Sequence, residues 1–213
     1  ITQPPANDNC ASAANVNALL GGAIGEPQVS TMYTNTEAGI ANDPGFGYEC
    51  FGEPDGTASG PSIEHTVWFN FTGDGNTYFI ETNDCNGTAT DYIPDGDTQM
   101  AIYSGICSII QAVDCNEDGP NATATEYPAG AELATEMGTN YLVMIDGYLG
   151  LTGDFCLSFT RMPVANDDCD GAEDISDILD GALNAPVESG MYSNVGATTS
   201  QDEPNPNDVV ANC

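Results

Sequence analysis

Residues 65–72 read HTVWFNFT, and their large apolar side chains alternate along the chain. Val67, Phe69 and Phe71 fall on one side, and the residues between them fall on the other. Successive side chains of a β-strand point to opposite faces, so this period of two predicts a strand. The same alternation returns in residues 155–159, which read FCLSF.

Further apolar runs between these two segments also have the composition of strands. They are residues 78–80, 100–103, 109–113 and 141–145. The last run, YLVMI, is nearly all apolar, as expected of a strand that is buried on both faces. Turns rich in Gly, Asn, Asp and Pro separate the runs, with only weak helical candidates at 11–20 and 170–179. The sequence therefore predicts an all-β fold, an antiparallel β-sandwich or jelly roll.

An internal repeat divides the chain. Residues 4–10 read PPANDNC and return as PVANDDC at 163–169, a shift that also aligns Met32-Tyr33 with Met191-Tyr192 and Asn35 with Asn194. We therefore expect one complete repeat unit in residues 1–162. Residues 163–213 are then a partial second repeat unit that corresponds to the opening third of the first.

Eight cysteines are spread along the chain without CxxC pairs, as in a disulfide framework of a secreted protein. The repeat aligns Cys10 with Cys169 and Cys50 with Cys213, so the simplest pairing is Cys10–Cys50 and Cys169–Cys213. Four cysteines then remain, which allow three connectivities. A bridge across a hairpin favours Cys107–Cys115, which leaves Cys85–Cys156. The alternative is that Cys169 or Cys213 is unpaired or bonded between chains.

The charge is extreme. The 213 residues contain 33 Asp and Glu against one base, Arg161, which gives a formal net charge of −32. Nucleic-acid binding needs clustered Lys and Arg and is excluded. No apolar run approaches the roughly 18 residues that a membrane span requires, so we expect no membrane insertion. The natural counter-partner of such a chain is a cation.

A candidate calcium site follows from the acidic loops. Residues 114–119 read DCNEDG and match the first half of the calcium-loop pattern, with Asp114, Asn116 and Asp118 as ligands. Asp95 and Asp97 could complete the shell. Thr125 stands where an EF-hand has its bidentate Glu, so this is no EF-hand. The alternative is an acidic hairpin loop without a metal.

Catalytic motifs are absent from the sequence. His65 has no nucleophile motif near it, and neither G-x-S-x-G nor H-E-x-x-H occurs, so we expect a structural histidine and no enzyme. Trp68 and the nine tyrosines could form a sugar-stacking face, but alternating aromatic residues in a sandwich more often fill the core.

Four segments in this order resemble a known family. They are VWFNF at 67–71, DTQMAIYSG at 97–105, VDCNEDG at 113–119 and YLVMIDGY at 141–148. The set resembles the pre-peptidase C-terminal-like β-sandwich modules found, often in tandem, in secreted bacterial surface proteins and proteases. The resemblance implies a non-catalytic jelly-roll-like module that sometimes binds calcium.

The partial unit carries the functional prediction. About fifty residues of a larger sandwich would expose strand edges and an uncovered apolar face. Either the polypeptide continues, or another molecule completes the unit by strand addition. We expect an extracellular, bacterial structural protein that assembles with copies of itself, end to end, into a surface filament. The alternative is an adhesin or carbohydrate-binding module of a longer secreted protein, with glycans as partners.

Overall fold

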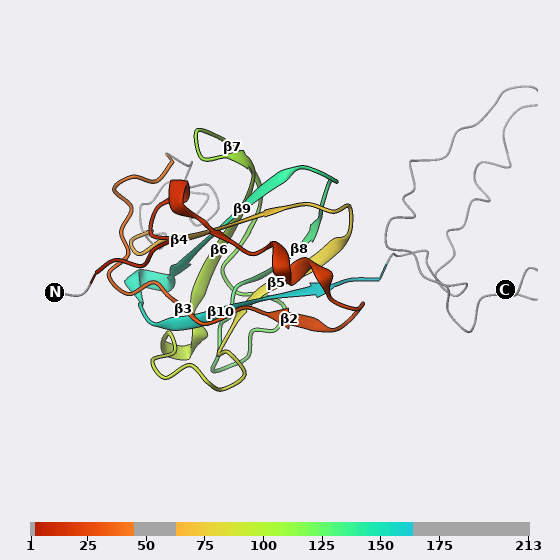
Figure 1. The fold of residues 1–213 in the computed structure, drawn as a ribbon. Coiled ribbons are helices and arrows are strands. Elements are labelled where there is room, and N and C mark those ends of the chain that lie inside the picture. The colour runs from red at the N-terminus through yellow and green to blue at the C-terminus, as the bar shows by residue number, and fades with distance from the viewer. Residues whose placement is uncertain (1–2, 45–62, 164–213) are drawn as a thin grey trace, which may run out of the picture. The chain divides into compact units, whose positions relative to one another are not determined.

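The computed structural model describes residues 3–44 and 63–163 (Figure 1). The chain divides into two units, Ile1–Met162 and Pro163–Cys213. All but the first residue of the second unit lies outside the described residues, so the partial repeat at 163–213 stays a prediction. No helix among the described residues is long and apolar enough to cross a membrane.

The described part of the first unit is a β-sandwich, which confirms the predicted fold class. One sheet has the strand order β1-β4-β9-β6-β7, and the other has the order β2-β10-β5-β8 with β3 also paired to β10. The strands are β1 (Ala14–Asn15), β2 (Pro27–Val29), β3 (Tyr33–Thr34), β4 (Val67–Thr72), β5 (Thr77–Asn83), β6 (Thr98–Ile106), β7 (Ile109–Asn116), β8 (Gly130–Ala134), β9 (Asn140–Gly147) and β10 (Asp154–Arg161). Short 3-10 helices join them: η1 (Cys10–Ser12), η2 (Asn17–Gly21), η4 (Pro94–Gly96) and η5 (Tyr148–Gly150).

The predicted alternation decides where the core lies. Val67, Phe69 and Phe71 of β4 are buried between the two sheets, together with apolar residues of β10. The Phe71 and Phe159 rings meet edge to face with their centroids 5.2 Å apart. Because β4 and β10 belong to different sheets, this contact holds the two layers together.

The outer face of the first sheet is also covered. Trp68 is fully buried there, in a second cluster with Met144 and Cys10. The chain segment that precedes β1 lies over this face, since the backbone N–H of Trp68 donates to the carbonyl of Asn7. Burial on both faces explains why residues 141–145 of β9, which read YLVMI, are apolar. It also confirms that Trp68 fills a core.

Two disulfides are described, and they correct part of the predicted pairing. Cys85–Cys156 is bonded as predicted, but Cys10 is bonded to Cys107. The predicted pairs Cys10–Cys50 and Cys107–Cys115 are therefore wrong. Cys107 lies in the turn between β6 and β7, whereas Cys115 lies near the far end of β7, opposite Ala101. The residues from 109 to 115 span about 20 Å of strand, too far for a bridge.

The remaining cysteines are only partly described. Cys115 is disulfide-bonded, and none of the other four described cysteines is its partner. Cys50, Cys169 and Cys213 lie outside the described residues, so Cys169–Cys213 stays a prediction. Disulfides persist in oxidising compartments, which indicates a non-cytoplasmic protein.

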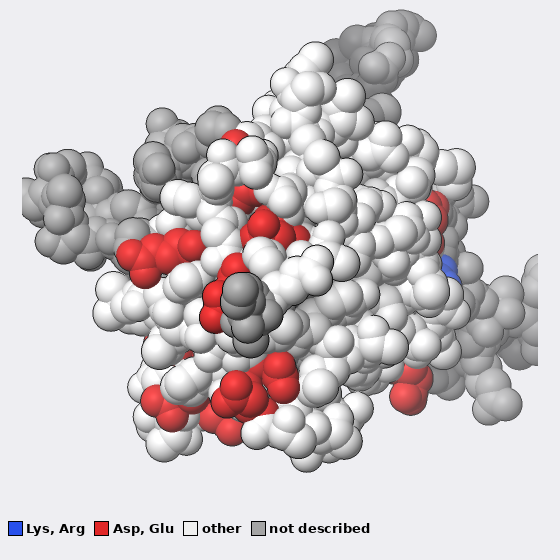
Figure 2. Space-filling model, turned by 60° about the vertical axis from the view of Figure 1, so that its left-hand side comes forward, with Lys and Arg blue, Asp and Glu red and all other residues white. Residues whose placement is uncertain are grey.

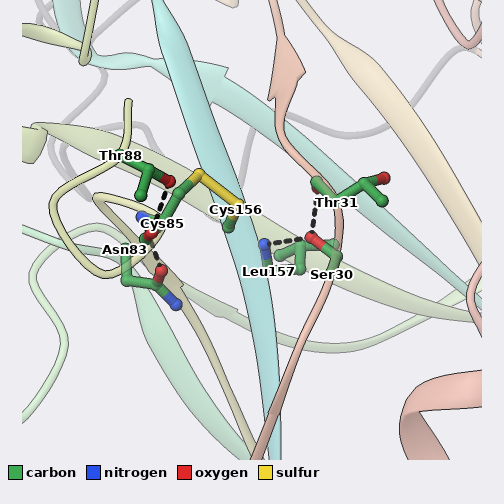
Figure 3. Close-up of a disulfide and its surroundings, with 7 residues drawn as sticks. All are labelled: Ser30, Thr31, Asn83, Cys85, Thr88, Cys156 and Leu157. Atoms are coloured by element: carbon green, nitrogen blue, oxygen red, sulfur yellow. Dashed lines mark hydrogen bonds between the residues drawn. A yellow bond between two sulfur atoms is a disulfide. The ribbon is translucent and has the colours of Figure 1, made fainter. Parts of the chain in front are cut away.

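The Cys85–Cys156 bridge joins the loop after β5 to the adjacent strand β10 (Figure 3). The Oγ1 of Thr88 donates to the carbonyl of Cys85 at 2.7 Å, which holds the loop in place. On the other edge of β10, the Oγ of Ser30 accepts the backbone N–H of Leu157 at 2.9 Å. This part of β10 is thus fixed from both sides.

Candidate functional site

The described residues form two candidate functional sites. One is the acidic pocket at the predicted calcium ligands, and the other is the surface on which the N-terminal strands lie. The pocket has a volume of about 290 Å³ and is lined by Asp97, Glu117, Asp118, Tyr127 and Tyr148. Its acidic residues come together because Asp97 directly precedes β6 and the other two directly follow β7, the neighbouring antiparallel strand.

The electrostatics of the pocket are unfavourable for a full set of carboxylates. Burial, followed by the negative charges of Asp118, Glu117 and Asp95, raises the pKa of Asp97 to about 6. Glu117 also accepts a hydrogen bond of 3.5 Å from Nε2 of Gln99, a fully buried side chain. A cation in the pocket would relieve this repulsion.

Three of the five predicted calcium ligands, Asp95, Asp114 and Asn116, do not line this pocket. Asp114 is exposed on β7, and its Oδ1 accepts the N–H of Cys115 at 2.8 Å. Asn116 accepts the N–H of Gly130 in β8, a hydrogen bond that ties the two sheets together. Both residues still belong to the strand, where the loop pattern assumed that the chain already turns. Among the described residues, no group of three His, Cys, Asp or Glu side chains is arranged to hold a metal ion.

Of the predicted ligands, Asp97 and Asp118 lie at the pocket, and the charge of Asp95 acts on Asp97. The pattern missed Glu117, because it falls on an unassigned position of the calcium loop. β7 ends at Asn116, so Glu117 and Asp118 leave the strand together. A prediction of this strand end would have identified Glu117 as a pocket residue. Calcium binding remains a prediction.

His65 has a structural place, as expected. Its backbone N–H donates to Oδ1 of Asp146 at 2.8 Å, and its ring Nδ1 lies 2.8 Å from the carbonyl oxygen of Ala38. Asp146 is fully buried in β9, and burial raises its pKa to about 6 even though it also accepts the N–H of Glu64. These bonds fix the chain where it enters β4.

The second site is the surface that receives residues 4–35, here named the opening segment. This segment supplies β1, which pairs in parallel with β4, and β2 and β3, which both pair with β10. It therefore adds a strand to the edge of each sheet. In Figure 1 the segment, in red and orange, runs across the sandwich from the first sheet to the second.

Polar side chains hold the opening segment at its two ends. Asn7 is buried, and its Nδ2 donates to the carbonyl of Trp68 at 3.2 Å while its own carbonyl accepts the Trp68 N–H at 2.9 Å. Asn35 is fully buried, and its Nδ2 donates to the carbonyl of Leu151 at 3.0 Å. The Oδ1 of Asn35 accepts the N–H of Gly153 at 2.8 Å.

Apolar and covalent contacts fix the segment between these ends. The Tyr33 ring meets the Phe69 ring edge to face, with the centroids 4.8 Å apart. Val16 and Leu19 are buried in the main core. Cys10 is bonded to Cys107 at the tip of the β6–β7 hairpin. The opening segment is thus an integral layer of the sandwich.

Comparison with known proteins assigns no family. No family model matches the chain, and no curated protein matches it. The structure is similar to PliG of Aeromonas hydrophila, a periplasmic lysozyme inhibitor of g-type lysozyme, with 8% identity over 70% of this chain and 96% of that chain and a TM-score of 0.35. It is also similar to a cycloisomaltooligosaccharide glucanotransferase of Paenibacillus sp., with 16% identity over 72% of this chain and 20% of that chain and a TM-score of 0.26. At these TM-scores neither similarity assigns a function.

Proposed function

We propose that the chain is a secreted structural protein of a bacterial surface, which assembles end to end by strand complementation. In this proposal residues 163–213 of one copy take the place of an opening segment on the sandwich of the next copy. The observation that supports it is the role of the opening segment in the first unit, where it completes an edge of both sheets.

The repeat preserves several of the residues that dock the opening segment. Asn7, Cys10, Tyr33 and Asn35 correspond to Asn166, Cys169, Tyr192 and Asn194. Ser30, which binds β10, corresponds to Ser189, and the buried Val16 and Leu19 correspond to Ile175 and Ile178. Residues 163–213 therefore carry several of the side chains that dock the opening segment on β4 and β10, although Glu173 and Asp174 stand where β1 has Ala14 and Asn15.

The disulfide pattern gives this proposal a chemical signature. Cys107 is bonded to Cys10 within one chain, and Cys169 is the counterpart of Cys10. In this proposal Cys169 is not paired with Cys213. When the second copy of the segment docks on a neighbouring sandwich, the Cys169 thiolate attacks Sγ of that neighbour's Cys107, forms the Cys107–Cys169 disulfide and releases Cys10 as a thiolate. A disulfide between chains then accompanies each joint.

We also propose that calcium stabilises the assembled protein at the acidic pocket. Like-charged chains repel one another, and a bound divalent cation lowers the charge that assembly must overcome. Asp97, Glu117 and Asp118 are the residues that would hold it. If a chelator leaves the melting temperature unchanged, this part of the proposal is wrong.

The full chain tests the assembly proposal directly. Electron microscopy and light scattering should show end-to-end oligomers or filaments in the presence of calcium. The double variant Tyr192→Ala with Asn194→Ala should remain monomeric, because it removes two docking side chains. The matched control is Thr198→Ala with Thr199→Ala, which changes two residues beyond the aligned positions and should still assemble.

Peptide mapping without reduction gives a second, independent measurement. Assembled material should contain Cys107 bonded to Cys169 of another chain. Only dispersed monomers under all conditions, or assemblies in which every Cys107 stays bonded to Cys10, would refute the proposal.

A further inference from the structure

A small hollow lies beside the Cys10–Cys107 disulfide, between the tip of the β6–β7 hairpin, the end of β4 and the start of β9. It has a volume of about 230 Å³, and both cysteines line it together with Ile106, Phe71 and Asn140. The tip of the hairpin stands out at the top of Figure 1. The bond that ties the opening segment to this tip thus forms part of a concave surface.

The two sulfur atoms of this bond are unequally accessible. Cys10 is 3% exposed, whereas Cys107 is only partly buried. Its neighbour Ile106 is 55% exposed and lines the same hollow. Thiol–disulfide exchange begins when a thiolate attacks one of the two sulfur atoms, so access decides which of them is attacked. An attack from the hollow therefore reaches Cys107 and makes Cys10 the leaving group.

The walls of the hollow carry no negative charge, and the attacking thiolate is an anion. Among the described residues, none that lines it is an Asp or Glu, and residues 98–113 contain no charged side chain. Figure 2 shows acidic side chains gathered in patches on one face, with wide uncharged areas between them. The carboxylate of Asp43 accepts the backbone N–H of Cys10, so this negative charge lies on the Cys10 side of the bond. A chain with a net charge of −32 repels thiolates in general, and the repulsion is weaker at Cys107.

The other disulfide whose two cysteines are both described lacks these properties. Cys85 and Cys156 are both buried, so neither sulfur atom is open to attack. Asp84 directly precedes Cys85, and Asp154 lies two residues before Cys156. Exchange is slow at sulfur atoms that a thiolate cannot reach. We therefore expect a thiol to distinguish the two bonds.

We propose that this hollow is a thiol-exchange site, at which a low-molecular-weight thiol opens the Cys10–Cys107 bond. The thiolate attacks Sγ of Cys107 and forms a mixed disulfide with it, and Cys10 leaves as a thiolate that takes up the proton that the attacking thiol had lost to solvent. The volume is below the roughly 300–1,000 Å³ of pockets that hold drug-sized ligands, so the hollow selects a small thiol. The site needs no residue of 163–213 and goes beyond the assembly proposed above.

Opening the bond removes the covalent tie near the N-terminal end of the opening segment. Asn7 is then held to β4 only by non-covalent contacts, among them the hydrogen bond of 2.9 Å from the Trp68 N–H to the Asn7 carbonyl. The amide of Trp68 should therefore exchange its hydrogen faster in the thiol adduct than in the closed chain. The thiol in this way regulates how firmly the opening segment is held, and an unchanged exchange rate in the adduct would overturn this regulation.

Peptide mapping of the full chain after treatment with 2-mercaptoethanol tests the site. The chain carries Tyr192→Ala with Asn194→Ala, so that end-to-end assembly is removed, and it is quenched in acid and alkylated only after denaturation. The adduct should lie on Cys107 and the alkylated thiol on Cys10, and this bond should open at least about tenfold faster than Cys85–Cys156. An adduct on Cys10, or equal rates for the two bonds, would overturn the proposal.

Charge variants at Ile106 separate the electrostatic argument from a loss of packing. Ile106→Asp should slow the opening of this bond about fivefold and Ile106→Lys should speed it by a similar factor, the effect of one unit charge about 4 Å away in water. A packing defect would move both variants in the same direction, and such a result would overturn the proposal.

Leu149→Asp and Leu149→Lys are the matched controls. Leu149 is 64% exposed and lies beyond the far end of β9, about 20 Å along the strand from Tyr141 at the hollow. Both control variants should react like the wild type.

This inference and the proposed assembly fail separately. Adducts on Cys107 in a chain that never forms oligomers would support the exchange site and refute the assembly. Filaments from chains whose Cys107 takes no adduct would overturn the exchange site alone.

Discussion

Replacing Asn35 by alanine removes the side chain that ties the opening segment to the loop before β10. The Asn35 amide makes two hydrogen bonds with backbone groups, at 3.0 Å to Leu151 and 2.8 Å to Gly153, and it is fully buried. Each buried partner left unsatisfied costs about 1–3 kcal/mol. Asn35→Ala should therefore lower the free energy of unfolding by about 2–6 kcal/mol.

The variant Asn35→Asp tests the same contact, because its loss of stability should depend on pH. It puts an oxygen where Nδ2 faced the Leu151 carbonyl, so the charged carboxylate is repelled as well as desolvated. The folded state then raises the pKa of this carboxyl above its unfolded value. Its charged form destabilises the fold at pH 7, and the loss shrinks as the pH falls through the raised pKa, because the protonated group can donate to the carbonyl.

Urea unfolding followed by the fluorescence of Trp68 measures both variants, since Trp68 is the only tryptophan and is fully buried. The quantity compared is the difference from wild type at pH 7 and pH 4.5, which cancels the titration of the other acids. Asn86→Asp is the control, as it adds a charge at an exposed residue. A loss below about 0.5 kcal/mol for Asn35→Ala, the range of ordinary surface substitutions, or a pH-independent loss for Asn35→Asp, would refute the reasoning.

Three further predictions concern other parts of the fold. Replacing both Cys10 and Cys107 by serine should lower the free energy of unfolding by about 3–5 kcal/mol, because the disulfide joins two residues that are 97 positions apart in the sequence. A change below about 1 kcal/mol in urea unfolding would contradict this. Without calcium, Asp97→Asn should stabilise the protein at pH 7.5, since the raised pKa of about 6 means that the charged carboxylate opposes folding. That gain should decline as the pH falls through 6, and calorimetry showing an equal gain at pH 4.5 and 7.5 would exclude it. Trypsin should cut the native chain slowly at Arg161, its only Lys or Arg residue. Arg161 ends β10, and the backbone N–H of Met162 donates to the carbonyl of Thr77, so the strand end is held in place. Urea should speed the cleavage, and rapid cleavage of the native chain would argue against a fixed strand end.

The strands could be predicted because their signal is local. The alternation around Phe69 depends only on the two-residue period of the pleat, and the same period found β10. The covering of Trp68 could not be inferred in this way. It depends on the segment around Asn7, which is about sixty residues away in sequence and has no periodic pattern of its own.

The partner of Cys10 and the residues that line the acidic pocket could not be predicted from the sequence, for a related reason. The repeat identified equivalent cysteines, but the partner of Cys10 is decided by which hairpin lies beneath it, and that is a property of the sheet order. The calcium pattern assumed one wrapped loop. Asp114 and Asn116 remain in β7, whereas Asp97 reaches Asp118 only because β6 and β7 are neighbours.

The time at which the bond between Cys10 and Cys107 forms determines whether a chain can still exchange its opening segment. Until Cys107 is oxidised, the opening segment is held only by reversible contacts, and a neighbour's residues 163–213 can compete for the same strands. Once the bond has formed, leaving requires thiol–disulfide exchange. Chains that are oxidised while dilute therefore stay closed until a thiolate attacks this bond, and chains that are crowded during export are joined more readily. Under the proposed function, the yield of assemblies should be set by the rate of oxidation relative to the rate of encounter, even though every chain has the same sequence.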